Sequence, residues 1–136
     1  MPSIHKEFLV NASPEFVWEA IKDVSSVHTR LAQGFVTSKV LVGDVRTVTF
    51  ANGFVVKERI VGVSDAQRRL AYAAIEGRAS HHNATLQVFA APNGQSRVVW
   101  ITDLLPDEMS APIEQMVALG ISAMTQTLER SFAVNQ

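Results

Sequence analysis

Two titratable side chains of this sequence, His82 and Glu58, each occupy a position in an otherwise apolar row. An imidazole titrates near neutral pH, and a buried carboxyl group can have its pKa raised into the same range. The pair could therefore act as acid and base in catalysis, or serve as polar anchors for a bound molecule. A structural role is the alternative for both: Glu58 could form an ion pair with Arg46 or Lys57, and His82 could be a hydrogen-bonded core histidine.

His82 stands near the start of a stretch, residues 80–90, whose alternating pattern is typical of a β-strand. Successive side chains of a strand point to opposite faces of the sheet. The face that includes His82 continues with Ala84, Leu86, Val88 and Ala90. A buried imidazole needs a hydrogen-bond partner, water or a ligand, so this apolar row predicts a cavity beside His82. His81 has the opposite parity, and we expect it at the surface.

The same side chains do not predict a metal or cofactor site. His81 and His82 are adjacent on a strand and point in opposite directions, so they cannot bind one ion as a pair. His28, Glu58 and His82 could meet only through tertiary structure. The sequence has no Gly-x-Ser-x-Gly nucleophile elbow, glycine-rich phosphate loop, dinucleotide-binding fingerprint or cysteine. We therefore expect neither a metal nor a cofactor.

The composition is that of one globular domain covering residues 1–136. Hydrophobic residues make up 47% and charged residues 18% of the chain. A net charge of -1 gives no electrostatic attraction to nucleic acid or to an anionic membrane. The first residues lack the apolar core of a signal peptide, and no later run is long enough to span a membrane. We expect a cytoplasmic protein.

The elements that would position these residues begin with a strand over residues 3–10. A helix over residues 14–23 follows, which Ser13 can cap and Pro14 can begin. A second short helix is expected over residues 27–32. The remaining strands are expected at 35–42, 46–50, 54–63, 70–75, 80–90 and 97–105. An Asn-Gly dipeptide and other turn signals link these strands closely, which implies an antiparallel sheet.

A long helix follows Pro106. Its apolar stripe consists of Ile113, Met116, Val117, Gly120, Ile121, Met124 and Leu128. Such a stripe needs a hydrophobic partner, and the sheet is the only large one available. The sequence therefore predicts an α+β fold in the order strand, two short helices, six strands and long helix.

Several short motifs fall in order along the predicted strands: Gly43-Asp44-Val45-Arg46, Glu58-Arg59-Ile60, Asp65, Arg69 and Glu76-Gly77. With the order of elements, they resemble the helix-grip fold of the START-like (SRPBCC) superfamily, which includes Bet v 1-type proteins, polyketide cyclases and plant abscisic acid receptors. The segments Trp100-Ile101-Thr102-Asp103 and Leu105-Pro106-Asp107-Glu108 look more like the bacterial polyketide cyclase/dehydrase group. Ala51-Asn52-Gly53-Phe54 stands where the receptors have a longer gate loop, so hormone-gated phosphatase binding is not implied.

The resemblance implies a curved sheet of seven strands wrapped around the C-terminal helix, with a cavity between them. Strand parity and the resemblance together predict the ligand-binding residues Val48, Phe50, Val56, Glu58, Ile60, Tyr72, His82, Ala84, Trp100, Thr102, Met116, Gly120 and Met124. Either Trp100 and Thr102 or Asp103 faces inward from the last strand, and we favour the former because a large ring is easier to bury. Gly120 would leave room beneath the helix. His28 would lie at the pocket rim or on the plain surface.

The resemblance implies three alternative functions. We favour the binding of a small, mostly apolar organic ligand of the lipid, polyketide or aromatic type. The second alternative is a polyketide cyclase or dehydratase that uses His82 and Glu58 as acid and base without a metal. The third is a protein-interaction module with a filled core. The sequence leaves open whether the chain is an enzyme and whether it forms a homodimer.

Overall fold

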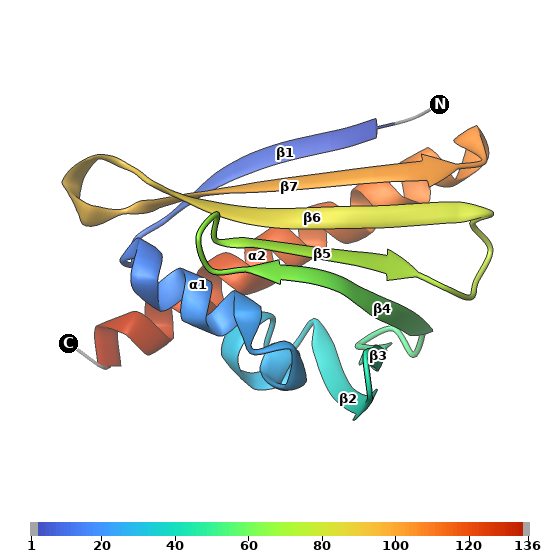
Figure 1. The fold of residues 1–136 in the computed structure, drawn as a ribbon, viewed down its shortest axis with the longest axis horizontal. Helices are drawn as coiled ribbons and strands as arrows, with labels where there is room; N and C mark the ends of the chain where they lie inside the picture. Colours follow the sequence, from blue (N-terminus) through green and yellow to red (C-terminus); the bar gives the residue numbers. More distant parts are fainter. Residues whose placement is uncertain (1–2, 135–136) are drawn as a thin grey trace.

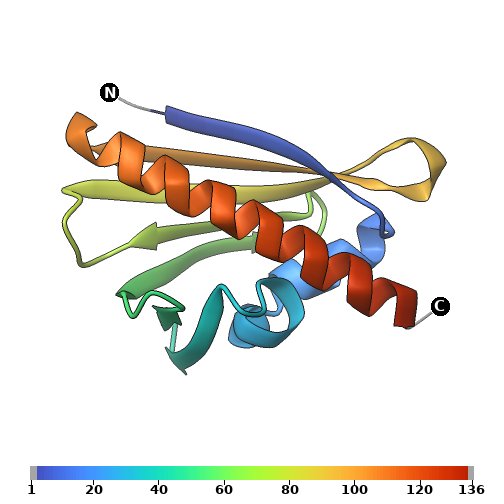
Figure 2. The same ribbon diagram turned by 180° about the vertical axis from the view of Figure 1, so that it is seen from behind.

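Seven antiparallel strands form one curved sheet, and a long C-terminal helix lies along its concave side (Figure 1, Figure 2). This computed structural model describes residues 3–134. The strands are β1 (Ser3–Val10), β2 (Val36–Val42), β3 (Val45–Phe50), β4 (Val55–Ser64), β5 (Arg69–Ala74), β6 (His81–Ala90) and β7 (Ser96–Leu105). The helices are α1 (Pro14–Lys22) and α2 (Ser110–Val134), and the short helical turns are η1 (Val24–Ser26), η2 (Val27–Leu31), η3 (Pro92–Gly94) and η4 (Asp107–Met109).

The strand order in the sheet is β1-β7-β6-β5-β4-β3-β2, so that β1 and β2 form its two edges. In the β6–β7 pair, Ala84 lies opposite Thr102. In the same pair, Leu86 lies opposite Trp100. Because residues that pair across antiparallel strands share a face, these four side chains all point to the concave side of the sheet.

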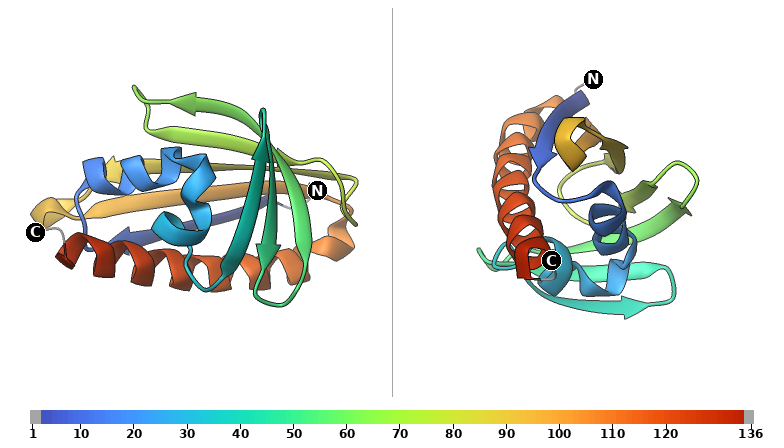
Figure 3. Two further views of the ribbon diagram at one scale, coloured as in Figure 1. Left: turned by 90° about the horizontal axis from the view of Figure 1, so that it is seen from below. Right: turned by 90° about the vertical axis from the view of Figure 1, so that its left-hand side faces the viewer.

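The sequence starts α1 where the N-cap signal predicts it. The Ser13 hydroxyl accepts a hydrogen bond from the backbone N–H of Phe16 at 3.2 Å, and Pro14 occupies the first helical position. The indole N–H of Trp18 donates to a carboxylate oxygen of Asp65 at 2.8 Å, which ties α1 to the turn after β4. The end-on view in Figure 3 shows the sheet curling around one side of α2, with α1 between α2 and the green strands in this view.

The 25 residues of α2 supply the other half of the core. Its buried positions are Val117, Gly120, Met124, Thr127 and Leu128. This spacing of three and four residues places one stripe of the helix against the sheet. The predicted start of the helix after Pro106 is a 3-10 turn, η4, which leads into α2 at Ser110.

The predicted α+β helix-grip architecture is confirmed by the order of elements and by the single seven-stranded sheet. The second short helix, predicted over residues 27–32, is present as the single π-helical turn η2, which the 3-10 turn η1 precedes. Apolar spacing cannot separate such turns from an α-helix because all three bring residues three to five apart to one side. Within residues 3–134, no helix is both long and apolar enough to cross a membrane.

Candidate functional site

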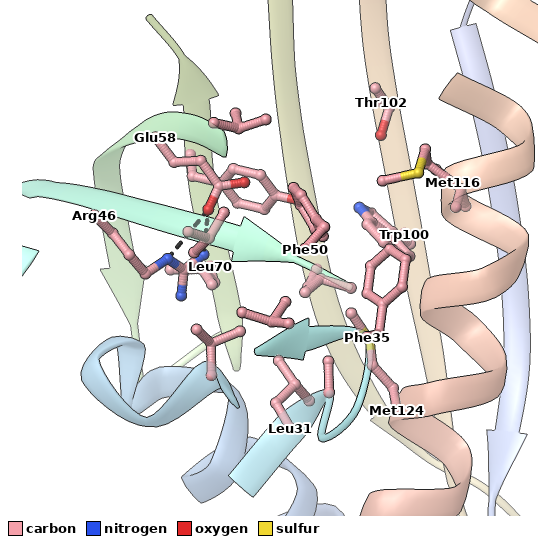
Figure 4. A pocket seen from close by; sticks show the side chains of 18 of the residues that line it. Leu31, Phe35, Arg46, Phe50, Glu58, Leu70, Trp100, Thr102, Met116 and Met124 are labelled. Atoms are coloured by element: carbon pink, nitrogen blue, oxygen red, sulfur yellow. Dashed lines mark hydrogen bonds and ion pairs between the residues drawn. The ribbon is translucent and has the colours of Figure 1, made fainter. Parts of the chain in front are cut away.

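A cavity of about 130 Å³ lies between the concave face of the sheet and α2 (Figure 4). We call it the inner chamber. Strands β2 to β7 form one wall, α2 forms the opposite wall, and η2 closes the end nearest α1. Ten of the thirteen residues predicted from the sequence line it: Val48, Phe50, Val56, Glu58, Tyr72, His82, Trp100, Thr102, Met116 and Met124.

A second cavity of about 290 Å³ adjoins the first, between the β3–β4 turn, the β5–β6 loop and the start of α2. We call it the outer chamber. The residues that border both chambers are Phe50, Val56, His82, Ile113 and Met116. Taken together, the two chambers reach the range of roughly 300–1,000 Å³ that is typical of small-molecule sites.

Three predicted residues do not line either chamber, and neither does His28. Ala84 is fully buried within the core, and Ile60 is half-buried on β4. Gly120 was expected to leave room beneath the helix, but the Trp100 ring fills that room. A Cβ atom added at Gly120 would lie 3.0 Å from two carbons of the indole six-membered ring. The glycine therefore permits the close approach of Trp100 to α2.

Ten further residues of the inner chamber were not predicted: Val27, Leu31, Ala32, Phe35, Val36, Arg46, Leu70, Leu86, Ile113 and Val117. Leu70 lies two residues before Tyr72, and Leu86 lies four residues after His82, so each pair shares a face of its strand. Extending the alternation along both strands would have predicted these two leucines. The residues of η2 had no such signal, because the irregular turn gives no period from which to assign a face.

Arg46 and Glu58 form a buried ion pair in the wall of the inner chamber. One carboxylate oxygen of Glu58 accepts hydrogen bonds from Arg46 Nη2 at 2.8 Å and from Nε at 3.1 Å (Figure 4). Nη1 of Arg46 donates to the backbone carbonyl of Val24 at 3.2 Å. Burial raises the pKa of the Glu58 carboxyl group, and the adjacent guanidinium opposes this shift. The sequence left a place in the cavity wall and a structural ion pair open as alternatives for Glu58. In the structure, Glu58 lines the cavity and also forms the ion pair.

The other titratable groups of the chamber are held in their neutral forms. Burial lowers the pKa of His82, and the neighbouring His81 lowers it further, so the imidazole is neutral at pH 7. No residue within the described range 3–134 hydrogen-bonds to the His82 ring. Burial and the charge of Glu58 raise the pKa of Tyr72 far above its usual range, and the Arg46 guanidinium and the Trp100 indole N–H oppose this shift. The Arg46 guanidinium lies 5.9 Å from the centre of the Tyr72 ring.

Two polar groups of β7 point into the inner chamber. The indole nitrogen of Trp100 is buried, and no atom of residues 3–134 accepts a well-formed hydrogen bond from it. The nearest candidate is the Tyr72 hydroxyl, whose pKa the indole N–H lowers, as the last of four influences on that group. Thr102 is only 2% exposed, and its hydroxyl group is turned toward the cavity (Figure 4). Asp103 faces the opposite side of the sheet, where it accepts hydrogen bonds from Ser3 and Asn83. Of the two orientations considered for β7, the structure therefore has the one in which Trp100 and Thr102 face the cavity.

His28 lies on η2, outside both chambers, and its Nδ1 atom is buried without a hydrogen-bond partner among the described residues. Across residues 3–134, no group of three or more His, Asp or Glu side chains is placed to hold a metal ion. His81 is exposed on β6 and hydrogen-bonds to Asn83, on the face opposite His82.

The family model described as "Polyketide cyclase / dehydrase and lipid transport" matches residues 1–133. The chain belongs to this family. Among proteins with curated descriptions, none matches the chain. The resemblance to the bacterial polyketide cyclase/dehydrase group, inferred from motifs and element order, is thereby confirmed.

Several solved structures with the same fold align with nearly the whole chain. The protein XoxI from Bacillus cereus is 23% identical, with 98% of this chain and 96% of that chain covered and a TM-score of 0.82. The Zhui aromatase/cyclase from Streptomyces is 15% identical, with 97% and 93% covered and a TM-score of 0.79. Norcoclaurine synthase from Thalictrum flavum, in complex with dopamine and hydroxybenzaldehyde, is 19% identical, with 99% and 88% covered and a TM-score of 0.77. At these identities the likeness establishes the fold alone.

Proposed function

We propose that this protein binds a small, mostly apolar organic molecule of the lipid, polyketide or aromatic type in the inner chamber. The observation that carries the proposal is an apolar chamber inside the domain into which a few fixed polar groups point. Sites of this composition bind small molecules because apolar walls supply affinity and the few polar groups set orientation. An apolar cavity of about 150 Å³ in another protein accepts benzene, so the inner chamber, at about 130 Å³, is close to the size that one such ring needs.

A larger ligand would extend from the inner into the outer chamber. The side chains between the two include Met116, whose flexible thioether adapts to different shapes. The side-chain amide of Asn52, in the β3–β4 turn, lies 3.9 Å from the Met116 sulfur. This contact joins the turn to α2 at the edge of the outer chamber.

The experiment compares two variants on neighbouring positions of β3. Val48 faces the inner chamber and is 2% exposed, whereas Thr47 has the opposite parity and lines neither chamber. Val48→Phe places a ring in the chamber, and Thr47→Phe places the same ring on the outer face. We expect Val48→Phe to weaken binding of acetophenone, measured by calorimetry, by at least about tenfold, because the added ring occupies space that the ligand would fill. Thr47→Phe should bind like the wild type.

A folded Val48→Phe protein with unchanged affinity would place the ligand elsewhere and overturn the proposal. Circular dichroism and the unfolding midpoint establish that each variant is folded. Native mass spectrometry of the purified wild-type protein tests for a co-purifying small molecule, which Val48→Phe should lack.

Catalysis of a cyclisation or dehydration is the second candidate, and the position of His82 favours it. The neutral imidazole lies between the two chambers without a hydrogen bond from residues 3–134, so it can accept a proton from a bound molecule. Glu58 is less suited to the role of base, because its ion pair with Arg46 stabilises the carboxylate. Incubation with a linear poly-β-ketone thioester, followed by mass spectrometry for loss of water, tests this candidate. His82→Gln should abolish the reaction and leave acetophenone binding unchanged.

The third alternative, an interaction module with a filled core, has no support from an interior that holds two chambers.

A further inference from the structure

The two tryptophans of the chain differ in how their indole N–H groups are satisfied. Trp18 donates to Asp65 at 2.8 Å. Trp100 is 7% exposed, and its N–H finds no well-aligned acceptor among residues 3–134. A buried donor without an acceptor is costly, and native structures rarely keep one unless a bound molecule satisfies it. The Trp100 N–H is therefore a specific feature of the inner chamber that the fold alone does not explain.

The Trp100 ring is held in an orientation that keeps its N–H directed into the chamber. Gly120 of α2 lies against the far edge of the six-membered ring, at atoms Cη2 and Cζ3, and Phe35 contacts the same region. The five-membered ring, which bears the nitrogen, points away from the helix (Figure 4). The donor cannot turn toward the protein without losing this packing. The protein acceptor it approaches is the Tyr72 hydroxyl, which lies in the wall of the same chamber but does not form a well-aligned hydrogen bond with it. An acceptor with good geometry must therefore come from inside the chamber.

The charged groups of the inner chamber cancel one another. Arg46 and Glu58 form a pair at 2.8 Å, and each of the three guanidinium nitrogens of Arg46 donates a hydrogen bond within the protein. His82 and Tyr72 are neutral at pH 7. A carboxylate brought into this chamber would lose its hydration and meet no unpaired cation. The site therefore favours an uncharged acceptor over an anionic one.

We propose, as a refinement of the ligand-binding function above, that the ligand is an uncharged aromatic carbonyl compound whose oxygen accepts a hydrogen bond from Trp100 Nε1. The aromatic part lies among Phe50, Met116 and Met124, and the Thr102 hydroxyl is placed to donate to the same oxygen. The Trp100 N–H selects for the acceptor, and the neutral chamber selects against acids of the same size.

Three probes of matched size separate these requirements. Acetophenone has a carbonyl acceptor, α-methylstyrene replaces the carbonyl oxygen by a methylene group, and benzoate carries a negative charge. Two-dimensional ¹H–¹⁵N spectra of the wild-type protein should show one indole signal for each of its two tryptophans. Trp100→Phe and Trp18→Phe assign these signals independently, so that one unfolded variant does not prevent the assignment.

Acetophenone should move the Trp100 indole proton downfield, as a new hydrogen bond does, and α-methylstyrene should not. The Trp18 signal should stay in place with both, because its N–H is already bonded to Asp65. The preference for acetophenone over α-methylstyrene, measured by calorimetry, should fall about tenfold in Trp100→Phe, since a single buried donor accounts for it. Benzoate should bind at least about tenfold more weakly than acetophenone.

Equal binding of acetophenone and α-methylstyrene, with no downfield shift at Trp100, would overturn the role of the indole N–H and leave ligand binding in the chamber intact. Benzoate binding as tight as that of acetophenone would overturn the selection against acids. If none of the three probes binds, both this inference and the proposed function fail.

Discussion

His82 is a titratable side chain in the wall of the cavity. It lies on β6 opposite Leu104, on the concave face of the sheet, and it borders both chambers. The alternation of apolar residues along the strand was enough to predict this orientation, because the histidine follows the parity of a buried row. The sequence could not tell whether a protein group satisfies the ring, since that depends on strands and helices brought together by folding. No residue in the range 3–134 does so.

The acid sensitivity of stability follows from the pKa of His82. Burial lowers this pKa below its ordinary value of about 6.5, so folding favours the neutral imidazole. The resulting stabilisation is present above pH 6.5 and is lost as the pH falls through the lowered pKa. We expect the free energy of unfolding of the wild type to fall more steeply between pH 7 and pH 5 than that of His82→Gln, measured with urea.

His81→Gln is the matched control, because His81 is exposed on the opposite face of the same strand. Its unfolding free energy should keep most of the wild-type pH dependence, because burial is the larger cause of the lowered His82 pKa and the charge of His81 the smaller. Glu58, whose pKa is raised, contributes in the opposite direction, but it does so in all three proteins. Parallel pH profiles for the wild type and His82→Gln would show that the imidazole is solvated rather than buried.

The Arg46–Glu58 pair predicts a large loss of stability when only one charge is removed. Arg46 is 4% exposed, and Arg46→Met leaves the Glu58 carboxylate buried without its cation. We expect a loss of roughly 3–5 kcal/mol, measured by urea unfolding at pH 7. The double variant Arg46→Met/Glu58→Leu should recover part of this loss, because no uncompensated charge is left in the core.

The neighbouring ion pair of Arg59 with Asp44 provides the control for that comparison. Its atoms are 3.7 Å apart, and both side chains are more than half exposed. Arg59→Met should therefore cost less than about 1 kcal/mol. Similar losses for Arg46→Met and Arg59→Met would mean that Glu58 accepts a proton when its partner is removed, and a shift of the loss with pH would reveal it.

At the scale of elements, the strands could be predicted better than the turns that join them. Parity assigns faces correctly wherever pairing is regular, as along β6 and the middle of β7. It fails at the bulge between Ile60 and Gly62 of β4, where the register with β5 shifts by one residue. Beyond this bulge, Val63 pairs with Leu70, whose side chain lines the inner chamber, whereas unbroken alternation from Ile60 places Val63 on the outer face. A sequence pattern cannot locate such a bulge, because one extra residue reverses the alternation without changing the composition.

The packing of β7 against α2 makes a prediction for Gly120. Alanine is favoured over glycine in a helix by about 1 kcal/mol, but its Cβ would lie 3.0 Å from the Trp100 ring. The ring borders the inner chamber and can move a short way into it, so we expect Gly120→Ala to change the free energy of unfolding by less than about 1 kcal/mol. Binding of acetophenone should weaken by on the order of tenfold, because the displaced ring occupies ligand space.

Leu119→Ala changes the adjacent residue of α2, which is 60% exposed, and should leave acetophenone affinity unchanged. Calorimetry measures both affinities, and urea unfolding measures both stabilities. Destabilisation of Gly120→Ala by several kcal/mol would show that Trp100 cannot move, and unchanged affinity would show that the ligand does not contact the ring.

At the scale of the whole molecule, the cavity is a product of the complete fold. Its walls come from η2, six strands and α2, which are far apart in the sequence. The sequence predicted the sheet and helix contributions because each follows a regular period. It could not predict the volume that remains after side chains pack, which depends on the curvature of the sheet and on the seating of Trp100 against Gly120.

A ligand that fills this cavity contacts the sheet and the helix at the same time, so it should stabilise both as one unit. At a free concentration one hundred times its dissociation constant, acetophenone should add about 2.7 kcal/mol to the free energy of unfolding. For a domain of this size that corresponds to a rise in the unfolding midpoint of roughly 10 °C. Far-UV circular dichroism, which follows the sheet and helices, and fluorescence of Trp18 and Trp100 should give coincident transitions. At the same acetophenone concentration, Val48→Phe should show at most about half of this rise, because its affinity is at least about tenfold weaker. A rise seen by fluorescence alone would mean that the ligand orders the surroundings of a tryptophan without joining α2 to the sheet.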